Sequence, residues 1–422
     1  MELEKLAVVG SGIAGMGAAY FLNDKYDITL FEKNNYVGGH TNTVTVDENG
    51  KNIFIDTGFM VFNKITYPNL TKLFEELDVK IKPAAMSFSV IDITSGLEFS
   101  GSGLNGLFAQ RKNLLNPSFI RMLLQINRFN SECLETLKDA KYYDYSLADY
   151  IKEKKFGDDF LNKYLVPMSA AVWSSPPDLM LKFPAKTLVR FFHNHGFLGL
   201  STQHQWYTVV DGSQSYREKI IKKYADKISV GKGVQKVARE NGKIKITTID
   251  SSVYEFDKVI FASHADETLA MLSDATELEI NLLGKFKYQL NKATLHTDSS
   301  IMPKNKKVWS SWNYRIEPKS GETKTSTIYY MNSLQQVSQN RDYFVSINDP
   351  GNIAGNKIIT EINYDHPLFD LEAIKAQDSL SEINLQGNNT YFCGSYFKYG
   401  FHEDAFTSAL RLSGQLRPDL KW

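Results

Sequence analysis

Cysteine is scarce in this 422-residue chain, which contains only Cys133 and Cys393. The two residues are far apart and form no CxxC pair, so the sequence excludes a disulfide framework and favours a reduced cytosolic setting. An excess of charge of one sign is also lacking, because 48 Lys and Arg residues balance 48 Asp and Glu residues. Proteins that bind nucleic acids normally carry a basic surplus, and we therefore expect no nucleic-acid partner.

Long hydrophobic runs are absent as well. Glycines 10, 12, 15 and 17 interrupt the apolar stretch at residues 6–22. No stretch reaches the roughly 18 uninterrupted apolar residues that a membrane-spanning helix requires, so we expect no such helix. The opening residues have neither the basic nor the apolar region of a secretory signal. Together with the scarcity of cysteine, this predicts a cytoplasmic protein.

Several catalytic signatures are missing. The chain has neither the GxSxG elbow of many hydrolases nor the GxxxxGK[ST] loop of many NTPases. His193, His195 and His204 lie near one another in the sequence, but no nearby Cys, Asp or Glu completes a set of metal ligands. We therefore expect no metal, and we interpret these histidines as polar contacts of a substrate-binding region.

A glycine-rich turn near the N-terminus is the strongest local signal. Residues 6–9 read as a strand, 13–22 as a helix and 27–31 as a second strand, with Gly10-Ser11-Gly12-Ile13-Ala14-Gly15 between the first strand and the helix. This context of GxGxxG is typical of a βαβ unit whose helix N-terminus binds a diphosphate. Glu32 ends the second strand, where its carboxylate can bind ribose hydroxyls and would repel a 2′-phosphate.

The region after Glu32 favours FAD over NAD. Gly38-Gly39-His40 resembles the extended FAD signature of amine-oxidase-like flavoproteins, in which two small residues let a second loop approach the pyrophosphate. That family usually has Arg after the doublet. We interpret His40 as a weaker, pH-dependent phosphate contact, with an ordinary loop histidine as the alternative.

The tail resembles the second half of that signature. Phe392–Ser395 followed by Gly400–Ala405 reads as a strand, a glycine turn and a helix start, whose N–H groups face the flavin N1 and O2. Many relatives have an acid where this chain has Ser395. Val234 stands where the broader superfamily holds adenine. The predicted cofactor-binding residues are Gly10, Gly12, Ile13, Ala14, Gly15, Glu32, Lys33, Gly38, Gly39, His40, Thr41, Val234, Gly394, Ser395, His402, Glu403, Asp404 and Ala405.

Two tyrosines are the candidate catalytic residues. Tyr396 and Tyr399 flank the proposed flavin edge, and we interpret them as walls of the substrate cavity beside N5. Packing in the core is the alternative for both. The amine-oxidase superfamily also places a lysine near N5, and Lys285, Lys287 and Lys398 are all possible matches with none compelling, which puts a standard amine oxidation in doubt.

Motifs along nearly the whole chain resemble one family. They are Gly38–Val44, Asp56–Asn63, Thr66–Leu70, Trp173–Pro177, Phe191–Gly196, Ser311–Tyr314 and Tyr399–Asp404. The family comprises bacterial NAD/FAD-binding proteins, relatives of the flavin-containing amine oxidases that are often encoded beside cyclopropane-fatty-acyl-phospholipid synthase-like methyltransferases. The resemblance implies noncovalent FAD and an α/β fold, with a Rossmann-like FAD-binding lobe of the glutathione-reductase/amine-oxidase type and a discontinuous α+β substrate lobe.

The order of the predicted elements suggests how these lobes divide the chain. We expect residues 1–80, 206–272 and 386–422 to form the FAD-binding domain, and residues 81–205 and 273–385 to form the substrate domain. The genomic context of the family implies an oxidoreductase that takes a hydride from a C–H bond of a fatty-acyl or other lipid substrate. The alternatives are an amine or polyamine oxidase, for which Glu403 and Asp404 are the obvious acids, an FAD-dependent lipid isomerase, and a non-catalytic binding protein.

Residues 104–130 suggest a peripheral membrane contact. Residues 99–131 contain no Asp or Glu but do contain Arg111, Lys112, Arg121 and Arg128. The residues that share one helical face are Phe119, Met122, Leu123, Ile126 and Phe129. Such a basic amphipathic helix can lie on the inner face of an anionic membrane or guide a lipid into a cavity. In the alternative, the helix packs its apolar stripe on the rest of the protein.

Overall fold

The computed structural model describes residues 2–199 and 202–422, and a five-stranded parallel sheet forms the centre of one side of it. The strands, in spatial order, are β10 (Ile228–Ser229), β2 (Asp27–Phe31), β1 (Lys5–Val9), β14 (Lys258–Phe261) and β20 (Thr390–Phe392). Leu6, Val8 and Ile260 are fully buried, as expected where both faces of a parallel sheet are covered. The strands predicted at residues 6–9 and 27–31 are confirmed.

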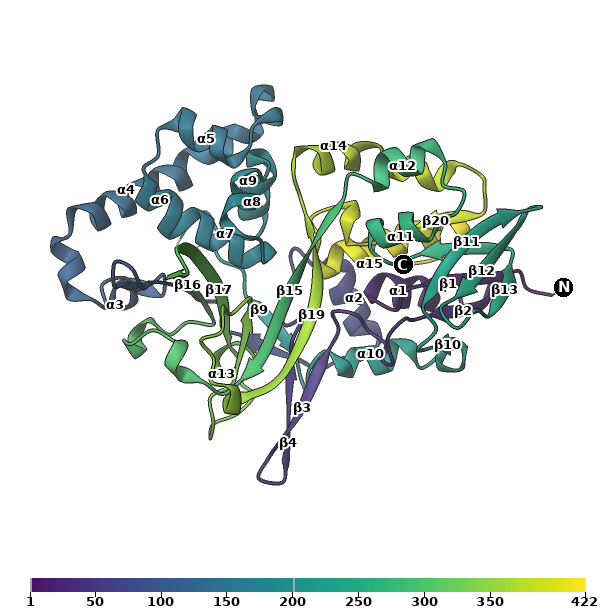
Figure 1. Cartoon of the computed structure of the whole chain (residues 1–422), viewed down its shortest axis with the longest axis horizontal. Helices are drawn as coiled ribbons and strands as arrows, with labels where there is room; N and C mark the ends of the chain where they lie inside the picture. Colours follow the sequence, from purple (N-terminus) through teal and green to yellow (C-terminus); the bar gives the residue numbers. More distant parts are fainter. Residues whose placement is uncertain (1, 200–201) are drawn as a thin grey trace.

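Helix α1 (Ile13–Leu22) lies against this sheet and against α15 (His402–Leu416). Every residue of α1 is buried, and a Cβ on Gly17 would come within 2.9 Å of the Phe406 ring. This glycine therefore allows the two helices to pack closely. The other helices on this side are α2 (Pro68–Glu76), α10 (Gln214–Ile221), α11 (Ala265–Met271), α12 (Glu277–Leu283) and α14 (Leu371–Ser379), as Figure 1 shows.

A three-stranded antiparallel sheet adjoins the parallel one. It consists of β11 (Val234–Glu240), β12 (Lys243–Thr248) and β13 (Val253–Phe256). Asn241 and Gly242 connect β11 to β12 with φ angles of 52° and 76°, the backbone that a two-residue type I′ hairpin requires. The Asn-Gly pair therefore forms the turn of this hairpin.

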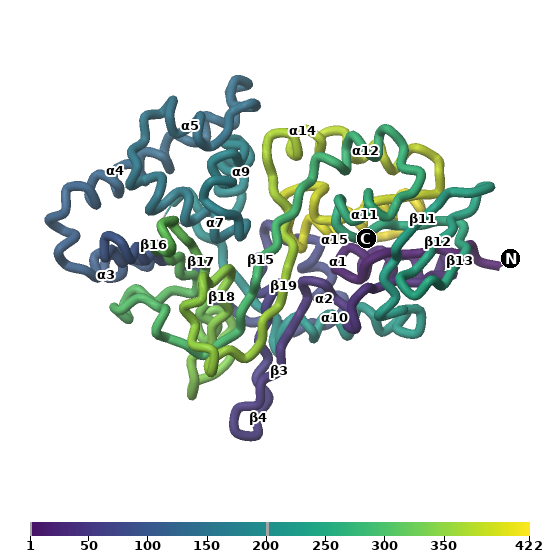
Figure 2. The backbone as a smooth tube through the Cα atoms, viewed as in Figure 1, coloured from purple at the N-terminus to yellow at the C-terminus, as the bar shows by residue number. Residues whose placement is uncertain are grey.

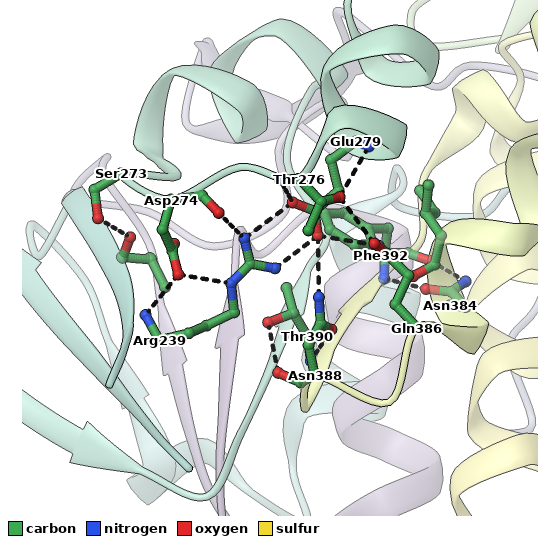
Figure 3. A network of polar contacts seen from close by, with 12 residues as sticks. Arg239, Ser273, Asp274, Thr276, Glu279, Asn384, Gln386, Asn388, Thr390 and Phe392 are labelled. Atoms are coloured by element: carbon green, nitrogen blue, oxygen red, sulfur yellow. Dashed lines mark hydrogen bonds and ion pairs between the residues drawn. The ribbon is translucent and has the colours of Figure 1, made fainter. Parts of the chain in front are cut away.

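A buried ion pair holds this small sheet in place (Figure 3). Arg239 of β11 donates to the two carboxylate oxygens of Glu279 at 2.7 and 3.0 Å and to Asp274 at 3.0 Å. Glu279, which is fully buried, also accepts from the backbone N–H of Thr276 and from the Gln386 amide. The network thus joins β11, the start of α12 and the segment before β20.

A seven-stranded mixed sheet dominates the other side. Its strands, in spatial order, are β19 (Ile358–Leu368), β15 (Lys287–His296), β18 (Phe344–Ile347), β17 (Glu322–Tyr330), β16 (Trp312–Lys319), β7 (Phe88–Asp92) and β8 (Leu97–Ser100). Figure 2 shows the long strands β15 and β19 running between the two sides of the molecule. The remaining elements are β3 (Thr43–Glu48), β4 (Lys51–Asp56), β5 (Phe62–Asn63), β6 (Ile81–Ala84), β9 (Trp206–Val209) and α13 (Met331–Leu334).

Helices gather at the end of the molecule opposite the N-terminus (Figure 1). They are α3 (Gly103–Leu107), α4 (Pro117–Glu132), α5 (Leu147–Lys154), α6 (Asp158–Phe160), α7 (Val166–Trp173), α8 (Pro177–Leu181) and α9 (Ala185–Asn194). Phe119, Met122 and Phe129 of α4 are buried in the core, with Leu123 and Ile126 packed against it. The apolar stripe of this helix therefore packs inside the protein. Of the two interpretations of this helix, the structure supports packing of the stripe on the rest of the protein and not membrane contact through it.

No helix within residues 2–199 and 202–422 has both the length and the apolar character needed to cross a membrane. The predicted boundaries between the two domains stay a prediction. The strands of the five-stranded sheet come from residues 5–31, 228–261 and 390–392, so segments distant in the sequence do meet around one sheet.

Candidate functional site

One cavity of about 650 Å³ lies where the glycine-rich turn, the start of α15, β19 and the helical cluster meet. Its volume falls in the range of small-molecule and cofactor sites. The predicted residues that line it are Gly10, Gly12, Ile13, Ala14, Glu32, Lys33, Gly39, His40, Val234, Gly394, Ser395, Tyr396, His402 and Ala405. Gly15, Gly38, Thr41, Tyr399, Glu403 and Asp404 do not line it.

The glycine turn leaves open space at the N-terminus of α1. Gly10 has φ +99° and donates its N–H to Phe31 O at 2.8 Å, which a left-handed backbone and a tight turn allow. A Cβ on Gly12 would meet no atom within 4 Å, whereas a Cβ on Gly15 would lie 1.8 Å from Gly10 O. Gly12 therefore faces the cavity and Gly15 packs the helix on the turn. The free N–H groups and positive end of α1 suit a diphosphate.

Glu32 holds this turn in place. One carboxylate oxygen accepts from Ser11 N at 3.0 Å and from Ser11 Oγ at 2.5 Å, and the other accepts from Asn34 N at 2.8 Å and Asn34 Nδ2 at 2.9 Å. The side chain is 5% exposed yet lines the cavity. Glu32 can therefore bind ribose hydroxyls from the cavity while its carboxylate keeps the turn in place. The sequence did not reveal this structural role.

The glycine doublet brings a second loop against the turn. Gly39 has φ +59°, and a Cβ there would lie 3.3 Å from Gly12 Cα. His40 follows and stacks on Tyr364 and His366 of β19, with ring centroids 4.7 and 5.2 Å apart. Burial, and then the neighbouring His366, hold the pKa of His40 well below its ordinary value. Its imidazole is therefore neutral near pH 7.

Charged side chains gather at the same end of the cavity. Lys33 donates to Glu267 at 2.5 Å, and both line the cavity with Asp365 and His264. Burial lowers the pKa of His264, whereas the nearby carboxylates of Glu267 and Asp365 act in the opposite direction. With Glu32, these residues make the end beside the glycine turn polar and ionic.

The opposite end of the cavity is aromatic. The rings come from the helical cluster, the loops and the strands, and they contact one another: Tyr67 with Trp206, Phe197 with Trp206, Trp173 with Phe191, Phe191 with Phe401, and Trp312 with Tyr329. Met60 and Met86 complete this wall. The lining contains no Asp, Glu, Lys or Arg from these segments. This end therefore suits an uncharged, apolar ligand.

The acids at the start of α15 serve helix ends rather than the cavity. Glu403 accepts from the backbone N–H of Asn69 at 3.0 Å and of Leu70 at 2.9 Å, and so caps the first turn of α2. Asp404 accepts from Tyr399 N and Phe401 N at 3.2 and 3.0 Å. Burial raises the pKa of Asp404 to about 6.

His402, beside these acids, does line the cavity. Its ring stacks on Phe59 at 4.0 Å, and its Nε2 lies 2.6 Å from Tyr216 Oη and 3.2 Å from Thr41 Oγ1. Burial lowers the pKa of His402 to about 3, so the ring is neutral. Thr41 thus contacts the cavity only through His402.

The two candidate tyrosines occupy different places. Tyr396 lines the cavity, is 1% exposed and packs on Phe286, with ring centroids 5.4 Å apart. Tyr399 lies outside the lining, where its carbonyl accepts from Trp173 Nε1 at 3.2 Å and its ring packs on Phe191. Tyr399 therefore supports the aromatic wall from behind.

None of the three lysines weighed for a place near N5 lines the cavity. Lys285 pairs with Glu372 at 3.2 Å, Lys287 is exposed on β15, and Lys398 lies 3.7 Å from Asp404. Within residues 2–199 and 202–422, no cluster of His, Cys, Asp and Glu could hold a metal ion. His195 is buried against Phe191, and His204 contacts Asn194 O.

Sequence reasoning missed most of the aromatic wall. Tyr67, Trp206, Trp312 and Tyr329 come from four separate elements, and no local pattern distinguishes a cavity wall from a core residue. The resemblance did mark segments that contain two of these four, Tyr67 and Trp312, together with Trp173 of the same wall. His366 and Tyr364, which stack on His40, lie in a strand that was not predicted.

Known proteins resemble this chain in sequence. The sequence model of a family described as flavin-containing amine oxidoreductase matches residues 13–344. A 1-hydroxycarotenoid 3,4-desaturase of Flavobacterium sp. (strain P99-3) is 25% identical over 291 residues, which cover 61% of this chain and 56% of that protein. The match thus spans little more than half the length of this relative.

Solved structures share the fold over the whole chain. A fatty acid isomerase from P. acnes that produces CLA superposes with a TM-score of 0.66 at 14% identity, covering 98% of this chain and 99% of the other. Cyclohexylamine oxidase from Brevibacterium oxydans IH-35A gives a TM-score of 0.68 at 12% identity, with coverage of 98% and 99%. The predicted mixed α/β fold is confirmed.

Proposed function

Because this chain belongs to the family of flavin-containing amine oxidoreductases, we propose that it binds FAD at the glycine turn and oxidises an uncharged, lipid-like substrate held in the aromatic end of the cavity. Membership of the family confirms the predicted enzyme class, an FAD-dependent oxidoreductase, and the predicted cofactor. That FAD is held without a covalent bond, and that the substrate is fatty-acyl or another apolar lipid, are proposals.

The division of the cavity into an ionic and an aromatic end carries the proposal. Glu32, Lys33, Glu267 and Asp365 lie at the end beside α1, where a dinucleotide carries its charge and its ribose hydroxyls. The other end offers aromatic rings and methionines and no ionised carboxylate. A cationic amine would lose its hydration there without gaining a counter-charge, at a cost of several kcal/mol. An acyl or polyene chain carries no charge there and therefore does not bear this cost of lost hydration.

The residues of this chain have separable tasks in the reaction. The N-terminus of α1 would hold the diphosphate of FAD, and Glu32 fixes the turn and would meet the ribose hydroxyls. Bound FAD supplies the two-electron acceptor for a hydride from a substrate C–H bond. The start of α15 directs N–H groups and a positive dipole end at the cavity, which favours negative charge there. The aromatic wall excludes water and orients the chain.

Three further observations support a lipid over an amine. Glu403 and Asp404, the acids weighed for binding a cationic substrate, are engaged with backbone N–H groups outside the cavity. Among residues 2–199 and 202–422, Lys33 is the one lysine that lines the cavity, and it pairs with Glu267 at the ionic end. Two of the relatives above are named for apolar substrates, a carotenoid and a fatty acid, and they support the same class.

Anaerobic reduction of the bound flavin tests this proposal. The FAD-loaded protein is mixed without oxygen with unsaturated fatty acids, phospholipids, a carotenoid, and mono- and polyamines, and the visible flavin band is followed. We expect bleaching by a lipid and none by the amines. Bleaching by amines alone would contradict the proposal. Lipid product formed with a moved double bond and no bleaching would assign net isomerisation instead of oxidation.

A matched pair of tryptophans localises the substrate. Trp312 lines the aromatic end, whereas Trp309 packs on Phe344 away from it. We expect Trp312→Ala to retain full flavin content and to slow bleaching by the lipid, and Trp309→Ala to bleach like the unmodified protein. Equal rates for both variants would place the substrate elsewhere.

A further inference from the structure

The helical cluster carries leucines on its outer surface. Leu104 of α3, Leu114 and Leu115 of the 3₁₀ turn at Arg111–Leu115, and Leu124 of α4 are 75%, 52%, 90% and 66% exposed. Single exposed leucines are common on globular proteins. Four within residues 104–124, with no described segment covering them, are a feature of this end of the molecule. We call these four residues the outer leucines.

The outer leucines are distinct from the apolar stripe that the sequence suggested for membrane contact. Phe119, Met122 and Phe129 of that stripe are buried in the core. Arg128 is also engaged, since it donates to Glu132 at 3.3 Å and to the carbonyl of Lys154. A membrane contact at this end must therefore use other side chains.

Basic side chains from two distant segments accompany the outer leucines. Arg111, Lys112 and Arg121 are exposed, and residues 99–131 contain no Asp or Glu. Arg111 donates to Phe108 O and Asn105 Oδ1 at 2.9 and 3.1 Å, neutral partners that leave its charge uncompensated. The segment 304–307 adds three exposed lysines, Lys304, Lys306 and Lys307.

Hydrogen bonds attach this second segment beside α3. Asn305 Nδ2 donates to Ala109 O at 3.2 Å, and buried Glu98 accepts from Lys304 N and Asn305 N at 2.9 and 3.1 Å. Glu98 is thereby satisfied by backbone N–H groups. The nearby acid Asp159 pairs with Lys163 at 2.6 Å. The surface is thus both apolar and basic.

We propose that this end of the molecule docks on an anionic phospholipid bilayer, with the outer leucines entering the interface and Arg111, Lys112, Lys304, Lys306 and Lys307 meeting the headgroups. Leucine beside Lys and Arg is the chemistry of peripheral membrane surfaces, whereas a protein partner would need no such single-sign charge. The docking goes beyond the proposed reaction and does not require it. The same cluster supplies Trp173 and Phe191 to the aromatic end of the cavity, so docking brings that end near its lipid source.

Vesicle flotation of the FAD-loaded full chain tests the proposal. Vesicles of phosphatidylcholine alone and of phosphatidylcholine mixed with phosphatidylglycerol are compared at low and high salt. We expect co-flotation with the anionic vesicles, little with the neutral ones, and release by salt. Each of Arg111, Lys112, Lys304, Lys306 and Lys307 changed to Gln should weaken partitioning about fivefold. No flotation with anionic vesicles, or equal flotation with neutral ones, would overturn the proposal.

Matched leucine variants separate docking from binding of lipid in the cavity. Leu104→Asn with Leu115→Asn should lose most partitioning while flavin content and anaerobic bleaching by a detergent-dispersed lipid stay unchanged. Leu290→Asn with Leu385→Asn changes two leucines that are 60% and 71% exposed elsewhere, and it should float like the unmodified protein. Equal flotation of the two double variants would overturn the role of the outer leucines, whatever the fate of the proposed reaction.

Discussion

Replacing Gly12 should separate the effect on cofactor binding from the effect on folding. Gly12 has φ −62° and ψ 177°, a backbone that any residue adopts, and a Cβ there would meet nothing within 4 Å. Two effects of Gly12→Ala on the free energy of unfolding oppose each other, and each is below about 1 kcal/mol. Alanine is a poorer N-cap residue than glycine, which lowers the stability, and it makes the unfolded chain less flexible, which raises the stability. We expect the flavin-free protein to keep its stability within about 1 kcal/mol.

Cofactor binding should respond very differently. The same open space is where a diphosphate must approach the N–H groups of α1, and the branched side chain of Gly12→Val fills it. Loss of two hydrogen bonds to a charged group, at about 1.5–3 kcal/mol each, weakens binding of FAD by about 3–6 kcal/mol, or roughly 10²–10⁴-fold. Titration of flavin-free protein with FAD, followed by flavin fluorescence, measures this loss.

Gly15→Ala is the contrasting control. Its Cβ would lie 1.8 Å from Gly10 O, a backbone atom that cannot move without opening the turn. We expect a loss of at least about 3 kcal/mol of unfolding free energy, measured by denaturant titration. The reasoning is refuted if Gly12→Val binds FAD as tightly as the unmodified protein, or if Gly12→Ala and Gly15→Ala destabilise the flavin-free protein equally.

Three further changes probe other parts of the structure. Glu32→Gln cannot accept all the hydrogen bonds from Ser11 and Asn34, so we expect calorimetry to show that FAD binds about 1–3 kcal/mol more weakly. Unchanged affinity would show that this carboxylate does not contribute to FAD binding. Glu279→Gln removes the buried carboxylate that accepts two bonds from Arg239, while Asp274 stays as the other partner, so we expect a loss of about 1.5–3 kcal/mol in denaturant unfolding, whereas a loss below about 1 kcal/mol would show the pair with Glu279 to be dispensable. Burial lowers the pKa of His296 from 6.5 to about 4, so His296 binds a proton in the unfolded chain before it does so in the folded one as pH falls. The free energy of unfolding should therefore drop by about 2 kcal/mol between pH 7 and 5 because of this residue. Denaturant titration of His296→Asn should show a smaller drop.

Local chemistry explains which parts of the fold could be predicted. The turn at Gly10–Gly15 and the Asn241-Gly242 hairpin each require a backbone that few residues other than glycine and asparagine adopt, so their sequences indicate their shapes. Helix α1 follows from its apolar spacing after the turn. The strands β15 and β19 were missed because polar residues such as Asn291, Lys292 and Glu361 break up their apolar residues, and β19 has one buried position along its length.

The candidate site was predictable only where the cofactor imposes a pattern. The diphosphate demands glycines and a helix start, and these are visible in one stretch of sequence. The aromatic wall imposes no spacing, because Tyr67, Trp206 and Tyr329 reach it from different elements. Glu403 resembled a site residue because it opens α15, yet its carboxylate caps α2, a neighbour that only the tertiary structure reveals.

The flavin content of the purified protein tests the central claim most directly. If the turn at Gly10–Gly15 holds FAD beside an apolar cavity, the protein is yellow, contains about one FAD per chain by its near-ultraviolet and blue absorption bands, and releases intact FAD when it is denatured. A colourless protein that takes up no added FAD would contradict the account.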